Sequence, residues 1–431
     1  MLYSNLEINN KGHLQFAGID TIELAKQYGT PAYVMDENRI RERCKTYINS
    51  VKKYFDENSK VLFAAKSICV KEILRILDSE GMCMDAVSSG EIFTAKEAGL
   101  DMSKVYFHGN NKTIDDINYA IDCGVGYFIV DNENELIRLN DIAKTRGITQ
   151  NILLRVTPGI DPHTHIKINT GMVDSKFGVA IETGQARNLT EKALAFSNVK
   201  LNGFHCHVGS QMFDNMPLFE ASHMMMRFIY NIKDEFGYSP KYLNLGGGMA
   251  VPYKSDESKI DYSSNLQKIS EIIKEQCEKH DIKMPSIMFE PGRSIVADSG
   301  ITLYEVGEIK EIPGVKNYVS VDGGMNDNPR YTLYHSPYTV LNASKMNLKD
   351  DYICTIAGRC CESGDLIQEN VFLPKPMRGD IIAVLTTGAY NYSMSSNYNC
   401  ITRPPIVIVK DGKSRLAVRR QTFEDLLSCQ I

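Results

Sequence analysis

Three side chains that can act in catalysis, and a glycine run, stand where predicted strands end. Lys66 and Glu290 each follow an apolar run, His207 ends a third, and the glycines 246–248 end a fourth. A lysine can carry an aldehyde cofactor covalently, and a carboxylate keeps a nearby ring nitrogen protonated. An imidazole can stack on a flat ring, and glycines let backbone N–H groups approach a phosphate. Together these groups predict a pyridoxal-phosphate site.

Each feature also has a simpler interpretation. A lysine at a strand end is most often a surface residue, and three glycines often form a tight turn. His205 and His207 could instead bind a metal, as in a metal-dependent barrel hydrolase. No carboxylate or further histidine stands near them at ligand spacing in the sequence, so no metal is expected. The pyridoxal-phosphate site is therefore predicted from the four features together and not from any one of them.

A repeating strand–helix pattern must position these residues. Helical patterns such as 113–123, 133–146 and 262–280 separate the strands. The expected strands are 61–66, 83–87, 105–108, 127–131, 152–157, 203–207, 242–245 and 286–290. Such units close into a (β/α)8 TIM-type barrel with its chemistry at the carboxyl ends of the strands. A doubly wound open sheet is the alternative, because counting repeats does not show closure.

The pattern changes after Gly300, where short strand-like segments joined by turns predict an all-β region. We expect the barrel at 34–296, and a β-barrel or sandwich domain formed by 1–33 and 297–431. The segment 328–334 is an exception, because a helix there would place Arg330 and Tyr334 on one face.

Composition narrows the class of protein. The 431 residues are enough for two domains. The net charge of -5, without a basic tract, argues against nucleic-acid binding. The sequence has no run of about eighteen apolar residues, so no membrane span is predicted. The first residues lack a signal-peptide pattern. The eleven cysteines have no disulfide-like or zinc-like spacing. We therefore expect a cytoplasmic protein with reduced thiols.

An ordered set of motifs spans residues 32 to 405. The chain resembles the diaminopimelate decarboxylase family, pyridoxal-phosphate enzymes with an alanine-racemase-like barrel and a β-domain. The motifs are Ala65-Lys-Ser67, Asp85-Ala-Val-Ser-Ser-Gly-Glu91, Ser175-Lys-Phe-Gly178, His205-Cys-His-Val-Gly-Ser-Gln211, Gly246-Gly-Gly248, Glu290-Pro-Gly-Arg293, Val321-Asp-Gly-Gly-Met-Asn-Asp327, Cys361-Glu-Ser-Gly-Asp365 and the segment from Gly388 to Tyr398. Each motif is weak alone, and their order is specific.

The resemblance implies roles on the cofactor. Lys66 would carry it, His207 would stack on its ring and Glu290 would pair with its nitrogen. Residues around its phosphate or the substrate would be Ser210, Gly246, Gly247, Gly248, Gly292, Arg293 and Tyr390.

The resemblance also implies a substrate. Arg293, Arg330 and Tyr334 would hold its distal carboxylate, and Glu362 its distal ammonium. Cys361 would supply the proton that replaces carbon dioxide, and in this family Cys361 and Glu362 come from the partner of a homodimer. The implied reaction converts meso-2,6-diaminopimelate to L-lysine and carbon dioxide, the last step of lysine biosynthesis.

Departures from the family pattern leave alternatives open. Ser67 and Ile68 replace the usual Ala-Asn, Pro329 precedes the arginine, and Cys360 competes with Cys361 for the role of proton donor. A decarboxylase of ornithine, arginine or lysine is one alternative, although it would leave two arginines without a carboxylate. A non-catalytic pyridoxal-phosphate carrier is another, although it would not need Cys361 and Glu362.

Overall fold

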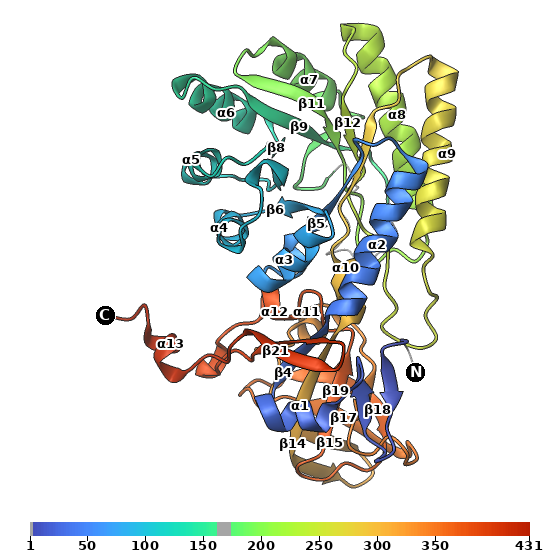
Figure 1. Cartoon of the computed structure of the whole chain (residues 1–431), viewed down its shortest axis with the longest axis vertical. Helices are drawn as coiled ribbons and strands as arrows, with labels where there is room; N and C mark the ends of the chain where they lie inside the picture. Colours follow the sequence, from blue (N-terminus) through green and yellow to red (C-terminus); the bar gives the residue numbers. More distant parts are fainter. Residues whose placement is uncertain (1–2, 162–173) are drawn as a thin grey trace. The chain divides into compact units, whose positions relative to one another are not determined.

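A computed structural model describes residues 3–161 and 174–431 and divides the chain into two compact units (Figure 1). The barrel unit comprises Arg43–Ala250 and Ile260–Gly292, and the β-unit comprises Met1–Glu42, Val251–Lys259 and Arg293–Ile431. The barrel predicted at 34–296 includes 34–42, 251–259 and 293–296, which the contacts of the chain group with the β-unit.

Eight parallel strands form a closed ring in the described part of the barrel unit. They are β5 (Lys60–Ala64), β6 (Cys83–Ala86), β7 (Val105–Phe107), β8 (Tyr127–Val130), β9 (Gln150–Thr157), β11 (Val199–His205), β12 (Tyr242–Asn244) and β13 (Ser286–Phe289). β13 returns to pair with β5, with Met288 opposite Lys60, which closes the ring. The short β10 (Val179–Ala180) adds to β9. The predicted TIM-type barrel is confirmed, and the open sheet is excluded.

Helices follow the strands of the barrel, and α8 and α9 pack side by side (Figure 1). The helices are α2 (Glu37–Tyr54), α3 (Lys71–Ser79), α4 (Ser89–Ala98), α5 (Ile114–Asp122), α6 (Glu133–Thr145), α7 (Gln185–Ala195), α8 (Met216–Phe236) and α9 (Tyr262–His280). Side-chain caps explain several abrupt starts. Ser88 caps α4, Thr113 forms a capping box with Asp116 at α5, and Asn132 caps α6.

A layer of inward side chains fills the barrel and keeps it from being a pore. Seven of the strands each contribute one buried side chain to this cluster: Leu62, Cys83, Tyr106, Ile129, Leu153, Tyr242 and Met288. The rings of Tyr106 and Tyr127 stack in parallel with centroids 4.6 Å apart. The packed interior makes the ring a rigid frame for groups at its carboxyl end.

The β-unit is built around the long strand β14 (Gly300–Ile312). β14 pairs with β15 (Lys316–Val321), β19 (Ile381–Leu385) and the N-terminal strand β4 (Ala32–Asp36). The remaining elements are β1 (Leu6–Ile8), β2 (Leu14–Phe16), β3 (Ile19–Asp20), β16 (Val340–Asn342), β17 (Tyr352–Ala357), β18 (Leu366–Leu373), β20 (Ile406–Lys410), β21 (Lys413–Val418), α1 (Thr21–Tyr28), α10 (Arg293–Val296), α11 (Arg330–Tyr334), α12 (Asn391–Met394) and α13 (Phe423–Leu427). The N-terminal segment therefore completes the β-unit, as predicted. Among the described helices, none has the length and apolar character to span a membrane.

Candidate active site

The carboxyl ends of the barrel strands bring the predicted cofactor residues to one end of the ring. The glycines 246–248 follow β12. The predicted strand 203–207 ends at His205, so His207 lies two residues beyond β11, and the predicted strand 286–290 ends at Phe289, so Glu290 follows β13. We expected Lys66 to end β5. It lies instead on a single 3-10 turn, Ala65–Ser67, that follows the strand. The strand ends at Ala64, and the Ser67 hydroxyl donates back to the Ala64 carbonyl at 2.8 Å. The turn leaves Lys66 exposed.

The Glu290 carboxylate is buried and contacted from three sides. Asn244 donates its Nδ2–H to Oε1 at 2.6 Å. His108 Nε2 lies 2.9 Å from Oε1, and His205 Nε2 lies 3.1 Å from Oε2. Burial raises the pKa of Glu290, but His108 and His205 outweigh that effect and hold the pKa well below its usual range. A negative charge is therefore stable here, as pairing with a protonated ring nitrogen requires.

His207 is a neutral, oriented imidazole. Burial lowers its pKa well below the ordinary value, and the positive charges of Lys66 and Arg155 lower it further. The Gly247 N–H points to Nδ1 at 3.3 Å. Nδ1 is therefore an acceptor, and the proton of the ring lies on Nε2. A neutral ring with a fixed tautomer is suited to stacking on a flat cofactor.

The glycine triplet has no room for side chains. A Cβ atom would lie 2.7 Å from the Cys206 carbonyl oxygen at Gly246 and 2.2 Å from the Glu290 carbonyl oxygen at Gly247. At Gly248 it would lie 2.3 Å from the Gly209 carbonyl oxygen. Gly246 and Gly248 also have positive φ angles, of 68° and 122°. The turn therefore exposes backbone that only glycine permits, and it fits a phosphate cradle.

Two further predicted cofactor residues of the barrel unit lie next to this turn. Ser210 is partly buried and follows Gly209, whose carbonyl oxygen approaches Gly248. A Cβ atom on Gly292 would lie 3.0 Å from the Ala64 Cβ and 3.1 Å from the Ser67 hydroxyl oxygen. Gly292 thus lets the segment after β13 pass close to the turn that carries Lys66.

A cluster of buried arginines and tyrosines lies within the β-unit. Arg293 Nη1 donates to the Tyr253 hydroxyl oxygen at 2.9 Å, and Arg330 Nη1 donates to the same oxygen at 3.1 Å. Arg330 Nη2 also donates to Ser336 at 3.1 Å. The guanidinium of Arg293 lies 4.8 Å from the ring centroid of Tyr390. The structure thus groups Arg293, Arg330 and Tyr390, while Tyr334, at the end of α11, is only partly buried.

The two adjacent cysteines differ in environment. Cys360 is buried, and its thiol contacts the Asn326 side-chain oxygen at 3.5 Å. Burial raises the pKa of Cys360 to about 12, and Asp365 adds to the rise. Cys361 and Glu362 are exposed, and the Cys361 backbone N–H donates to Asn399 at 2.7 Å. Cys361 is therefore the better placed of the two thiols to meet a second molecule.

His108 and Asn244 were missed because each stands alone in the sequence. His108 follows β7, and Asn244 ends β12. Asp85, on β6, opens one of the family motifs but was given no role. A systematic reading of the strand ends would have marked His108 and Asn244 as candidates. Tyr253 has no such signal, because it lies on a loop whose contacts are with distant parts of the chain.

The arrangement also bears on the metal alternative. His205 does not pair with His207, because their rings contact Glu290 and Gly247 respectively. Instead, donor atoms of His108, His205 and Glu290 lie within 4.8 Å of one another. Among the described residues, this cluster has the donor spacing of a metal site, and the His-x-His pair does not.

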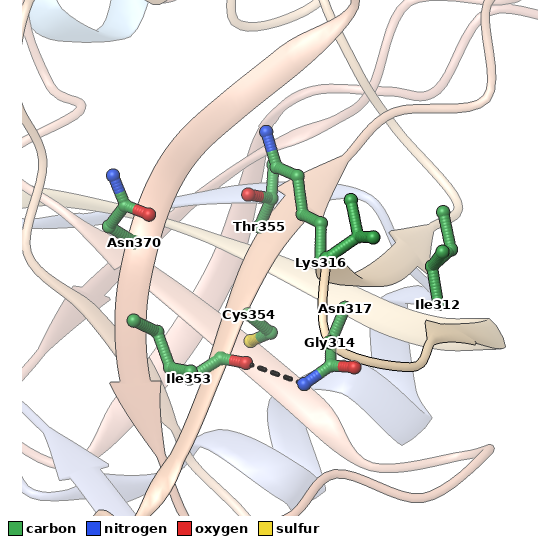
Figure 2. A pocket seen from close by; sticks show the side chains of 9 residues that line it. Ile312, Gly314, Lys316, Asn317, Ile353, Cys354, Thr355 and Asn370 are labelled. Atoms are coloured by element: carbon green, nitrogen blue, oxygen red, sulfur yellow. Dashed lines mark hydrogen bonds between the residues drawn. The ribbon is translucent and has the colours of Figure 1, made fainter.

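A separate hollow of about 260 Å³ lies on the β-unit between β15, β17 and β18 (Figure 2). Two of its lining residues are joined by a hydrogen bond, in which the Asn317 side chain donates to the Ile353 carbonyl oxygen at 3.0 Å. The amine of Lys316 is already paired with Glu369 at 2.7 Å. The hollow is lined by none of the predicted site residues, and we assign it no part in the chemistry.

The barrel residues fit pyridoxal phosphate. The glycine turn is a cradle that a single Cβ would fill, and Glu290 offers a stable negative charge. Lys66 is exposed on the adjacent turn, and His207 is a neutral ring. These groups would hold the phosphate, the ring nitrogen, the aldehyde carbon and the ring face of the cofactor.

Comparison with known proteins agrees with this geometry. The pyridoxal binding domain of the pyridoxal-dependent decarboxylases matches residues 37–297. The diaminopimelate decarboxylase of Bacillus methanolicus is 43% identical over 97% of this chain and 97% of its own length, and that of Bacillus subtilis is 40% identical over 100% and 98%. A crystal structure of the M. jannaschii diaminopimelate decarboxylase with L-lysine superposes with a TM-score of 0.91 at 35% identity, covering 99% of this chain and 98% of that one. The chain therefore belongs to the diaminopimelate decarboxylases, a family of pyridoxal-dependent decarboxylases.

Proposed function

We propose that this chain converts meso-2,6-diaminopimelate to L-lysine and carbon dioxide with pyridoxal phosphate as its cofactor. When bound, that cofactor accepts the electron pair left on the α carbon after carbon dioxide departs. The protein has to hold the cofactor, orient the scissile carboxylate and return a proton to the α carbon.

The barrel unit would supply most of the cofactor contacts in this proposal. Lys66 would hold the cofactor covalently through its amine. Glu290 would keep the ring nitrogen protonated, and His207 would lie against the ring face. Contacts to the phosphate or the substrate are assigned to Ser210, Gly246, Gly247, Gly248 and Gly292 of the barrel unit and to Arg293 and Tyr390 of the β-unit.

Recognition of the substrate rests on one observation above all. Arg330 is 7% exposed, and no described carboxylate pairs with it. A buried guanidinium without an acidic partner is costly, so the site is built for an anion from outside the chain. The distal carboxylate of diaminopimelate is such an anion, whereas ornithine, arginine and lysine have none to offer. Arg293 and Tyr334 complete the proposed carboxylate site.

Completion of the reaction is assigned to the partner of a homodimer. Cys361 returns the proton to the α carbon, and Glu362 binds the distal ammonium. Their exposure supports this assignment, because a residue that acts on a neighbouring subunit must lie at the surface of its own.

The test is conversion of meso-diaminopimelate by the purified chain with added pyridoxal phosphate. We expect equal amounts of L-lysine and carbon dioxide, and no loss of activity with a metal chelator. Borohydride should fix the cofactor to the peptide that contains Lys66. Lys66→Ala should abolish both results, and the exposed neighbour Lys71, changed to alanine, should leave both intact. Label on another lysine, or activity that a chelator removes, would overturn the proposal.

A further inference from the structure

Two buried histidines flank the carboxylate that is assigned to the ring nitrogen of the cofactor. His108 and His205 are 4% and 1% exposed, and their rings meet edge to face with centroids 4.8 Å apart. They reach Glu290 from different strands of the barrel, at 2.9 Å and 3.1 Å. Neither histidine has another described carboxylate at hydrogen-bond distance. The next one, Oδ1 of Asp85, lies 3.7 Å from Nε2 of His108. The Nε2 atom of His205 is therefore directed at Glu290, whereas Nε2 of His108 lies close to the carboxylate without hydrogen-bond alignment.

The contacts of the described residues leave acceptor positions free on the carboxylate. A carboxylate offers about four lone-pair positions. Asn244 and His108 approach Oε1, and His205 approaches Oε2. Each oxygen thus has one hydrogen bond to a described side chain and keeps a further lone pair. These two hydrogen bonds, with the close contact of His108 to Oε1, restrict the rotation of the carboxylate.

The protonation states agree with this geometry. Burial lowers the pKa of His205 to about 4, although Glu290 acts in the opposite direction. His205 is therefore a neutral imidazole near neutral pH, and a neutral ring that donates to Glu290 carries its proton on Nε2. The Nδ1 atom of His205 has no hydrogen-bond partner among the described residues.

We propose that His108 and His205 are positioning residues that orient the Glu290 carboxylate toward the ring nitrogen of the cofactor. They act through Glu290 and do not touch the substrate. This inference rests on the cofactor assignment of the proposed function, and it holds for any amino-acid substrate.

A double-mutant cycle with Glu290 separates positioning from a general effect on folding. His205→Met removes the donor in a buried position, and His205→Gln keeps an N–H group at similar reach. We expect His205→Met to lower kcat about 10- to 100-fold, taking as a guide the range found for groups that orient metal ligands. KM should change much less, and His205→Gln should recover most of the loss. In a Glu290→Gln background, His205→Met should cost almost nothing more.

Binding of the cofactor gives a second readout that needs no turnover. Titration of the apoenzyme with pyridoxal phosphate should show weaker binding in His205→Met and near-normal binding in His205→Gln. His108→Met should behave as His205→Met does, with the same loss of effect in the Glu290→Gln background. Additive losses in either double variant would overturn the inference.

The wild-type protein provides a check that does not depend on a variant that folds. Nitrogen NMR of histidine-labelled apoenzyme should show His205 neutral with its proton on Nε2. A charged ring, or a proton on Nδ1, would contradict the inference. If Glu290→Gln itself kept full turnover and cofactor affinity, the cofactor assignment under the proposed function would fail instead.

Discussion

The phenol oxygen of Tyr253 lies 3.1 Å from Nη1 of Arg330 and accepts its N–H. The same oxygen accepts from Arg293 at 2.9 Å, so two buried guanidinium groups converge on one neutral oxygen. Burial raises the pKa of Tyr253, but the two arginines outweigh that effect and lower it. Because Arg330 has no acidic partner among the described residues, this part of the β-unit is receptive to an anion.

Tyr253→Phe tests whether this oxygen maintains the anion site. The change removes an acceptor from two buried donors, and such a loss costs about 1–3 kcal/mol. We expect kcat/KM for meso-diaminopimelate to fall by about tenfold to a hundredfold, with the visible band of the bound cofactor unchanged. Tyr352→Phe is a matched control, because Tyr352 contacts Glu311 on the surface of the same unit. Equal activity of the two variants would show that Tyr253 has no part in the site.

The strands of the barrel could be predicted from the sequence better than the side-chain contacts at their ends. The eight strands were found because each is a short apolar run, and Lys66, His207 and Glu290 because each follows one. The turn at Lys66, within which the Ser67 hydroxyl donates to the Ala64 carbonyl, was not predicted. The contacts of His108, His205 and Asn244 with Glu290 were not predicted, because the side-chain conformations that bring them to one carboxylate leave no pattern in the sequence. The grouping of Tyr253 with Arg330 depends on contacts between distant segments.

The two adjacent cysteines can be separated by substitution. Because general-acid catalysis contributes about 10²- to 10⁴-fold, Cys361→Ala should lower kcat within that range. Cys360→Ala should keep most of the activity, since the Cys360 thiol is buried and its pKa is raised to about 12. Turnover of meso-diaminopimelate by each variant is the measurement. The reverse order of effects would assign the proton to Cys360.

Mixed dimers test whether Cys361 acts across subunits. Lys66→Ala and Cys361→Ala proteins, each nearly inactive, are dissociated together and reassociated. Random pairing makes half of the dimers mixed, and each mixed dimer has one site with both residues intact. Activity should return to about a quarter of the wild-type value. Subunit exchange without any recovery would mean that Cys361 acts within its own chain or not at all.

Glu37 links the stability of the β-unit to pH. Its side chain is 3% exposed and pairs with Arg41, Lys410 and Arg415 at 2.8, 2.8 and 2.6 Å. Burial raises the pKa of Glu37, but the three cations outweigh it and lower the pKa from 4.5 to about 2. A lowered carboxyl pKa stabilises the folded state fully above about 4.5, and this contribution is lost as the pH falls toward about 2.

Urea unfolding at several pH values measures this contribution. Glu37→Gln should lower the free energy of unfolding near pH 7 by ~1–3 kcal/mol, between the values for exposed and buried pairs. The difference from wild type should shrink as the pH falls below 4.5, the ordinary carboxyl pKa. Glu42→Gln is the control, because Glu42 is 60% exposed. A difference that does not vary with pH would show that the pairs do not stabilise the fold.

The specificity ratio of the wild-type enzyme and Arg330→Ala tests the assignment of substrate most directly. The quantity is kcat/KM for meso-diaminopimelate divided by kcat/KM for L-lysine, which lacks the distal carboxylate. A site built around that carboxylate should favour diaminopimelate by ~10⁴-fold or more. Arg330→Ala should remove about 2–5 kcal/mol of this preference and keep the visible band of the cofactor, while Arg378→Ala, at an exposed arginine, should change neither. A wild-type preference for lysine, or a ratio that Arg330→Ala leaves unchanged, would contradict the proposed function.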